Sequence, residues 1–187
     1  LSSLPQWTIV PAAIFREEDA QEYLKLNTDL SPGDEVAFTR LDGLEAVLIR
    51  RKDKESEQLL SQIQPAMEGN HLASVLLEST RRKAGLREDN LMQVVILDGV
   101  ATIIIFKDGK LLLANSVVAE KAEDLLYYIF YTLKKLNIPA EIPAEILGFG
   151  TLVSSVRSQG MKFLRNLETP DSKSDEHRLA KILSRCA

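Results

Sequence analysis

Apolar residues in the second half of the chain follow two periods, which predict most of its secondary structure. Short, nearly continuous apolar runs predict buried strands, and apolar residues at every third or fourth position predict amphipathic helices. The strands are expected at 92–97, 100–106, 111–118, 144–147 and 161–167. The helices are expected at 120–136, 152–157 and 173–185. The predicted order is three strands, a helix, a strand, a helix, a strand and a helix.

Two Asp-Gly dipeptides separate the first three of these strands. Asp98-Gly99 and Asp108-Gly109 favour two-residue hairpins, because Asp and Gly tolerate the positive φ that such turns require. The three strands are therefore expected to form an antiparallel meander, and the later strands alternate with helices. This is the element order of the ribonuclease-H-like unit, and two such units make the actin-like fold.

The first half of the chain is less regular. Strands are expected at 6–10, 35–39 and 44–50, helices are expected at 14–26 and 54–67, and the segment 72–83 fits either a strand or a helix. The order matches a ribonuclease-H-like unit only if the opening hairpin is missing. Residues 6–10 are then the third strand, 14–26 the first helix and 44–50 the fourth strand.

A polar, charged stretch at 85–90 is the best internal boundary. We therefore predict an α/β protein with an actin-like ATPase fold and two ribonuclease-H-like subdomains with mixed sheets, 1–87 and 88–187. The first is expected to lack its N-terminal hairpin. The chain begins with Leu1 rather than methionine, which suggests a fragment that lacks its true N-terminus.

Composition and charge narrow the classes of function. Of the 187 residues, 45% are hydrophobic and 27% are charged, as in ordinary globular proteins. The net charge of −4 argues against binding to nucleic acid or to an anionic membrane, since phosphate binding requires clustered Lys and Arg. Cys186 is the single cysteine, so no disulfide forms within the chain and a reducing, cytoplasmic location is expected. The apolar runs are far shorter than the roughly 20 residues that span a bilayer.

Several segments together resemble a known family. They are 7–15 (WTIVPAAIF), 22–27 (EYLKLN), 106–116 (FKDGKLLLANS), 123–129 (EDLLYYI) and Leu147-Gly148. In this order they are similar to an uncharacterised Bacteroidetes family, domain-of-unknown-function family 3822. The resemblance implies an actin-like ATPase fold with no established activity or substrate. This chain departs from the family in holding less sequence before Trp7 and in having Val117 where an aromatic residue is expected.

Four residues are candidates for nucleotide binding. Glycines let backbone N–H groups approach phosphates, and an aspartate can hold Mg²⁺ directly or through water. Asp98-Gly99 stands at the turn where the second phosphate hairpin of an actin-like protein would lie, and Gly148 and Gly150 stand where its adenosine site would lie. The alternative is that all four residues form structural turns, because Asp-Gly turns and isolated Gly-x-Gly sequences have low specificity.

Other chemistry has weaker support. A ribonuclease-type nuclease requires carboxylates that converge on two metal ions. Asp98 and either Glu123 or Asp124 could contribute, but the fourth strand ends in Leu147-Gly148 without a carboxylate. This absence and the acidic composition argue against a nuclease.

The remaining polar and aromatic residues suggest structural roles. His71 and His177 have no neighbouring metal ligands at a suitable spacing, so we interpret them as surface or boundary residues. The basic run 81–83 is interpreted as a solvated helix end. Tyr127 and Tyr131 lie four residues apart on one helical face and indicate either the edge of the core or an interface.

We therefore interpret the protein as a non-catalytic scaffold or interaction protein that binds an unknown protein partner and needs no cofactor. The alternative is an ATP-binding protein or ATPase with Mg-ATP at Asp98, Gly99, Gly148 and Gly150. A third hypothesis, a subunit of a larger assembly, predicts an apolar patch on the folded surface. The sequence determines neither the partner nor the oligomeric state.

Overall fold

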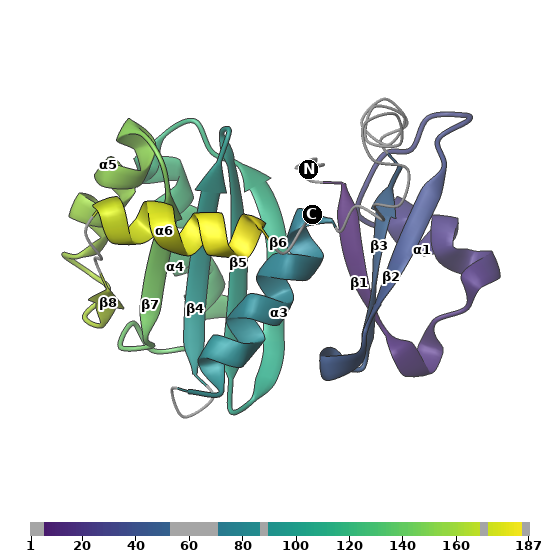
Figure 1. The fold of residues 1–187 in the computed structure, drawn as a ribbon, viewed down its shortest axis with the longest axis horizontal. Helices are drawn as coiled ribbons and strands as arrows, with labels where there is room; N and C mark the ends of the chain where they lie inside the picture. Colours follow the sequence, from purple (N-terminus) through teal and green to yellow (C-terminus); the bar gives the residue numbers. More distant parts are fainter. Residues whose placement is uncertain (1–5, 53–70, 87–89, 169–171, 185–187) are drawn as a thin grey trace. The chain divides into compact units, whose positions relative to one another are not determined.

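The computed structural model describes residues 6–52, 71–86, 90–168 and 172–184 (Figure 1). Its contacts divide the chain into two compact units, Leu1–Glu78 with Leu183–Ala187, and Ser79–Ile182. The division falls inside helix α3 (Leu72–Ala84), so the segment that fitted a strand or a helix is a helix. The subdomain boundary between residues 87 and 88 stays a prediction. The helix expected at 54–67 lies outside the described residues.

The second unit contains a mixed five-stranded sheet. Its strands are β4 (Leu91–Leu97), β5 (Val100–Lys107), β6 (Lys110–Val118), β7 (Ala144–Gly148) and β8 (Leu167–Glu168). Their order is β6-β5-β4-β7-β8. The first three are antiparallel, whereas β4 pairs with β7 and β7 pairs with β8 in parallel. This is the strand order of the ribonuclease-H-like unit.

Strand β8 is much shorter than the strand expected at 161–167. The backbone N–H groups of Met161, Phe163 and Leu164 donate to carbonyls at the end of the preceding helix, those of Arg157 and Gly160. Groups that are occupied in this way cannot also join a sheet ladder. The segment therefore extends the helix end as a series of turns.

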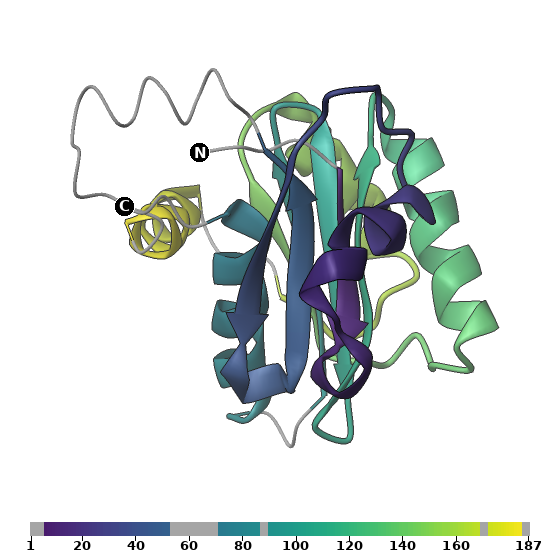
Figure 2. The same ribbon diagram turned by 90° about the vertical axis from the view of Figure 1, so that its right-hand side faces the viewer.

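Helices cover both faces of this sheet (Figures 1 and 2). They are α4 (Ala122–Lys135), α5 (Thr151–Gly160) and α6 (Ser172–Leu183), together with the end of α3. Successive strand residues point to opposite faces. Met92, Val94 and Ile96 of β4 pack with α4 and α5 in the main core. Gln93 points to the opposite face, which α3 and α6 cover, where it contacts Thr80 of α3.

The first unit contains a separate three-stranded sheet. Its strands are β1 (Trp7–Pro11), β2 (Val36–Leu41) and β3 (Ala46–Arg51), in the order β1-β3-β2. All neighbours are antiparallel. The assignment of 6–10 and 44–50 as third and fourth strands of a ribonuclease-H-like unit is therefore wrong. In that unit the third and fourth strands run in the same direction, as β6 and β7 do, whereas β1 and β3 are antiparallel.

The helix expected at 14–26 is shorter than its sequence pattern predicted. Two 3-10 turns, η1 (Ala12–Ile14) and η2 (Glu17–Asp19), precede α1 (Ala20–Lys25). Phe15 and Arg16 between them are extended. The ring of Phe15 packs against Phe38 of β2, with 5.1 Å between centroids. This tertiary contact accompanies the break in the helix. A third 3-10 turn, η3 (Asp42–Leu44), lies between β2 and β3.

Candidate functional site

The candidate Asp98-Gly99 closes the hairpin between β4 and β5. Leu97 pairs with Val100, so the loop holds two residues, and both have positive φ, 48° and 74°. These values define a type I′ turn, which suits the right-handed twist of the strands. The dipeptide Asp108-Gly109 at the other end of β5 has φ values of 50° and 73°. The two turns therefore have nearly equal φ angles.

The structure brings the four nucleotide candidates to one edge of the sheet. Ile96 near the end of β4 pairs in parallel with Gly148 at the end of β7. Asp98-Gly99 and Gly148-Phe149-Gly150 thus follow the carboxyl ends of two neighbouring parallel strands. Ligands of α/β proteins commonly bind at such an edge. The turn at Asp98-Gly99 and the strand end at Gly148 lie where the sequence predicted them, and nucleotide binding at these residues stays a prediction.

Gly148 is required by packing. A Cβ at this position would lie 2.3 Å from the backbone oxygen of Ile96 and 2.7 Å from Cγ2 of Val153. Its φ of 147° is also one that residues with a side chain rarely adopt. The absence of a side chain lets β7 approach β4 and lets α5 pack against both.

Gly150 differs from Gly148 because no packing requires it. It has φ 89° and ψ −178°, a conformation that is almost confined to glycine, and a Cβ would meet nothing within 4 Å. Gly150 is the N-cap of α5 and offers no side chain to the free N–H groups of the first turn. Open space and unsatisfied donors together are compatible with an approaching anion.

The fit of these residues to Mg-ATP is incomplete. Of the three candidate glycines, Gly99 and Gly150 border open space, whereas Gly148 does not. Within the described ranges, no three His, Cys, Asp or Glu side chains lie close enough to hold a metal ion. The carboxylates considered for a nuclease, Asp98, Glu123 and Asp124, are all exposed. Glu123 instead accepts a hydrogen bond from Gln159 (2.8 Å), which lowers the pKa of its carboxyl group.

The most distinctive polar cluster of the second unit was not predicted. Glu145 of β7 is 0% exposed. Its carboxylate accepts hydrogen bonds from Nζ of Lys83 on α3, from Nη1 of Arg178 on α6 (2.7 Å) and from Nε2 of Gln93 on β4 (2.8 Å). The oxygen of Gln93 accepts a hydrogen bond from Thr80 of α3 (2.7 Å). We call these five residues the Glu145 network.

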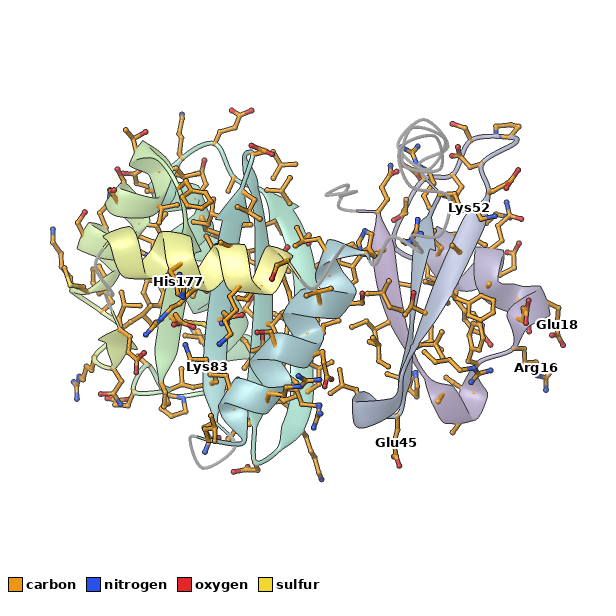
Figure 3. All side chains as sticks on the ribbon, in the orientation of Figure 1. Arg16, Glu18, Glu45, Lys52, Lys83 and His177 are labelled. Carbon is orange, nitrogen blue, oxygen red and sulfur yellow. The ribbon has the colours of Figure 1, made fainter. Side chains whose placement is uncertain are left out.

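The Glu145 network keeps a buried carboxylate ionised. Burial raises the pKa of Glu145, but the hydrogen bond and charge of Lys83, followed by Gln93 and Arg178, outweigh this and lower the pKa below its ordinary value. Lys83 therefore does not belong to a solvated helix end, because its side chain is only 26% exposed and lies on the face that α6 covers (Figure 3). The sequence signal that could have predicted the network is the presence of Gln93 and Glu145 within the apolar runs of β4 and β7.

Comparison with known proteins decides the family. The family described as "Protein of unknown function (DUF3822)" matches residues 3–167. The chain belongs to this family. The resemblance seen in the sequence is thus confirmed. The DUF3822 chain matches no curated protein.

Two solved structures resemble this DUF3822 protein. One is a crystal structure from Bacteroides thetaiotaomicron VPI-5482, described as a protein with actin-like ATPase fold and unknown function. It has 26% identity and a TM-score of 0.76, and the match covers 88% of this chain and 64% of that chain. The other is the PilM-PilN type IV pilus biogenesis complex, with 12% identity, a TM-score of 0.56 and coverage of 88% and 65%. The chain thus spans about two thirds of each neighbour, and its fold is actin-like.

The two histidines of this DUF3822 protein have different environments. His177 on α6 is exposed, as predicted (Figure 3). His71 is not a surface residue, because it is only 4% exposed. It precedes α3, where its carbonyl accepts hydrogen bonds from Ser74 and its Nδ1 accepts one from the N–H of Ala73 (3.2 Å). His71 therefore caps the helix in its neutral form.

The cap makes stability depend on pH. Burial, followed by the charge of Arg50, lowers the pKa of His71 from 6.5 to about 4. Between these values the unfolded state holds the proton and the folded state does not, so the free energy of unfolding decreases as the pH falls. At about 1.36 kcal/mol per pH unit, we expect a loss of about 3 kcal/mol by about pH 4.

This prediction is tested by urea unfolding between about pH 7 and pH 5. His71→Asn is the matched variant, because asparagine keeps a capping oxygen and does not titrate. Its stability should change less than that of the native chain within this interval. Equal slopes for both proteins would refute the assignment to His71.

Proposed function

We propose that this protein is a non-catalytic scaffold or interaction protein with an actin-like fold. The observation that carries the proposal is the similarity between the two Asp-Gly turns. Asp98-Gly99, which would contact a phosphate in an ATPase, forms a two-residue turn with nearly the same φ angles as Asp108-Gly109 at the other end of β5. A simple hairpin therefore accounts for Asp98-Gly99, and packing accounts for Gly148.

Other features support a role in binding protein. The second structural neighbour is a complex of two proteins, PilM and PilN. The net charge of −4 does not favour nucleic acid as a ligand. In the part of the chain that the structure describes, no helix is both long enough and apolar enough to span a bilayer. We propose a cytoplasmic protein that binds a protein partner and needs no cofactor.

The alternative is an ATP-binding member of the same superfamily. It is favoured by Gly150, whose glycine-only backbone borders open space before the first turn of α5. Under this alternative Asp98 and Gly99 would lie at the phosphates of Mg-ATP, and Gly148 and Gly150 would lie at its adenosine site.

Thermal unfolding with and without Mg-ATP separates the two functions. A ligand at about 100 times its Kd stabilises the folded state by about 2.7 kcal/mol. In a chain of this size the midpoint would increase by about 5 to 10 °C. For the full-length scaffold we expect no increase. An increase of this size would overturn the proposal.

Two matched substitutions make this result specific. Asp98→Asn and Asp108→Asn each remove one carboxylate while asparagine retains the positive φ of the turn. If nucleotide binds at the predicted edge, only Asp98→Asn should reduce the midpoint increase. An equal reduction by both would indicate binding elsewhere.

A further inference from the structure

The longest helix of the second unit presents an exposed aromatic surface. Tyr127 and Tyr131 of α4 are 74% and 50% exposed, and their rings stack with 6.2 Å between centroids. Phe130 on the neighbouring side of α4 packs edge-on against Phe163, at 5.5 Å. Phe163 is 59% exposed and Met161 is 54% exposed. We call these five residues the α4 aromatic patch.

Packing within the protein does not explain the exposed part of the patch. The buried side of α4 already contributes Leu125, Leu126, Ile129 and Leu133 to the core. Contiguous exposed apolar side chains are uncommon on soluble proteins unless they bind something. Tyrosine is also enriched where binding energy is concentrated. The patch therefore has the composition of an interface.

Positive charges lie beside the α4 aromatic patch. Lys134 lies one helical turn after Phe130 and Tyr131, and Nζ of Lys135 lies 5.4 Å from the ring centroid of Tyr131. Lys162 is exposed between the two apolar residues that follow α5. Neither Lys134 nor Lys162 forms an ion pair with a residue that the structure describes. In a chain of net charge −4, this is a local reversal of sign.

The other charges near the patch do not neutralise these lysines. Arg165 pairs with Glu141 at 3.0 Å. Glu123 accepts a hydrogen bond from Gln159, and Asp124 is exposed beside it in the first turn of α4, at the opposite end of the helix from Lys134. Lys121 precedes α4 at this acidic end, where Glu120, Glu123 and Asp124 outnumber it. The charge pattern thus favours one orientation of a ligand. Its negative end should face Lys134 and Lys135, and Lys162 adds a positive charge between Met161 and Phe163.

We infer that the α4 aromatic patch binds an acidic, apolar segment of a partner protein. The inference rests on the proposed function. Apolar side chains of the segment cover Tyr127, Tyr131 and Phe163, and its carboxylates contact the lysines. Such complementarity provides specificity and accelerates association. Carboxylates at the far end of α4 disfavour an anionic lipid surface as the occupant.

The test uses a labelled helical peptide that carries leucines on one face and glutamates on the other. A second peptide has lysines in place of the glutamates. Fluorescence anisotropy with the full-length protein should show tighter binding of the acidic peptide, weakened by added salt. Equal affinity for both peptides, or no binding of the acidic one, would overturn the inference.

Variants locate the binding site. Tyr127→Ala/Tyr131→Ala removes the exposed rings and retains strong helix formers, and Lys134→Glu/Lys162→Glu reverses the charge. Each should raise the Kd of the acidic peptide at least about tenfold, as for residues central to an interface. The controls Val118→Thr and Lys110→Glu alter exposed residues of β6 and should change the Kd less than about twofold. Equal effects of patch and control variants would refute the site.

Two further measurements distinguish other occupants and the broader proposal. Binding to phosphatidylglycerol vesicles but not to the peptide would show that the patch binds a membrane instead of an acidic partner. A dimer that forms in the native chain and is lost in the tyrosine variant would show that the patch binds a second copy of this chain. A photoreactive residue at position 131 should crosslink a protein in the native host. If a photoreactive residue at position 118 crosslinks and position 131 does not, the patch fails and the scaffold proposal survives. If neither position crosslinks, both proposals lose support.

Discussion

Replacing both cations of the Glu145 network, in Lys83→Met/Arg178→Met, should lower the free energy of unfolding by about 3 to 5 kcal/mol. The carboxylate of Glu145 is 0% exposed and would retain only the hydrogen bond from Gln93. An uncompensated buried charge is among the most destabilising changes in a protein core. Urea unfolding followed by circular dichroism measures the loss. Either single variant should lose less, because the other cation remains.

The result has an internal rescue and a surface control. Adding Glu145→Gln to the double variant removes the unpaired charge and should restore most of the stability. Arg165→Met breaks an exposed ion pair with Glu141 and should cost less than about 1 kcal/mol. A double variant no less stable than Arg165→Met would show that the network contributes little.

The network also predicts a change in pH dependence. In the native chain the pKa of Glu145 is lowered, so the stability it contributes is present above its unfolded pKa and is lost as the pH falls through the folded value. Without the two cations, burial would raise this pKa instead. The double variant should therefore be least stable, relative to the native chain, near neutral pH.

Gly148→Ala should lower the free energy of unfolding by about 4 kcal/mol. Overpacking costs about 1–3 kcal/mol, and a backbone conformation foreign to L-residues costs about 1–3 kcal/mol more. The added Cβ would lie 2.3 Å from a backbone oxygen of Ile96, which no side-chain rotation relieves. Thermal and urea unfolding measure the loss.

Gly150→Ala is the matched variant, because its Cβ meets nothing within 4 Å. Its free energy of unfolding should decrease only by the cost of the backbone conformation, about 1 to 3 kcal/mol. Adding Val153→Ala to Gly148→Ala should not rescue stability, since the contact with the backbone of Ile96 remains. Full rescue would contradict this explanation. Gly148→Ala is consequently unsuitable as a probe of nucleotide binding, whereas Gly150→Ala remains usable.

The candidate site was predicted unevenly. The turn at Asp98-Gly99 and the strand end at Gly148 and Gly150 were located correctly, because hairpin turns and strand ends depend on a few neighbouring residues. Their roles were not predictable, since the contact of Gly148 with Ile96 joins positions far apart in the chain. Neither the DUF3822 family nor the actin-like fold predicts an activity for this chain, because function depends on sites rather than on folds.

Strands β4 to β7 of the second unit follow from local patterning, whereas the turns after α5 reduce β8 to two residues. Strands β4, β5 and β7 are largely buried, Asp-Gly turns separate β4, β5 and β6, and α4 has a regular apolar stripe. In the first unit the helical pattern breaks at Phe15, whose ring packs on Phe38, and β3 takes the central position between β1 and β2. Packing between distant segments outweighs weak local preference in both cases.

The buried polar residues also separate what the sequence determines from what only the folded structure determines. Net charge, the lone cysteine and the amphipathic helices are properties of the chain itself, and they limit the classes of function without any knowledge of the fold. The ionised state of Glu145 and the neutral cap at His71 are not such properties. Each requires burial together with partners from other parts of the chain, which come together only when the sheet and its helices have formed.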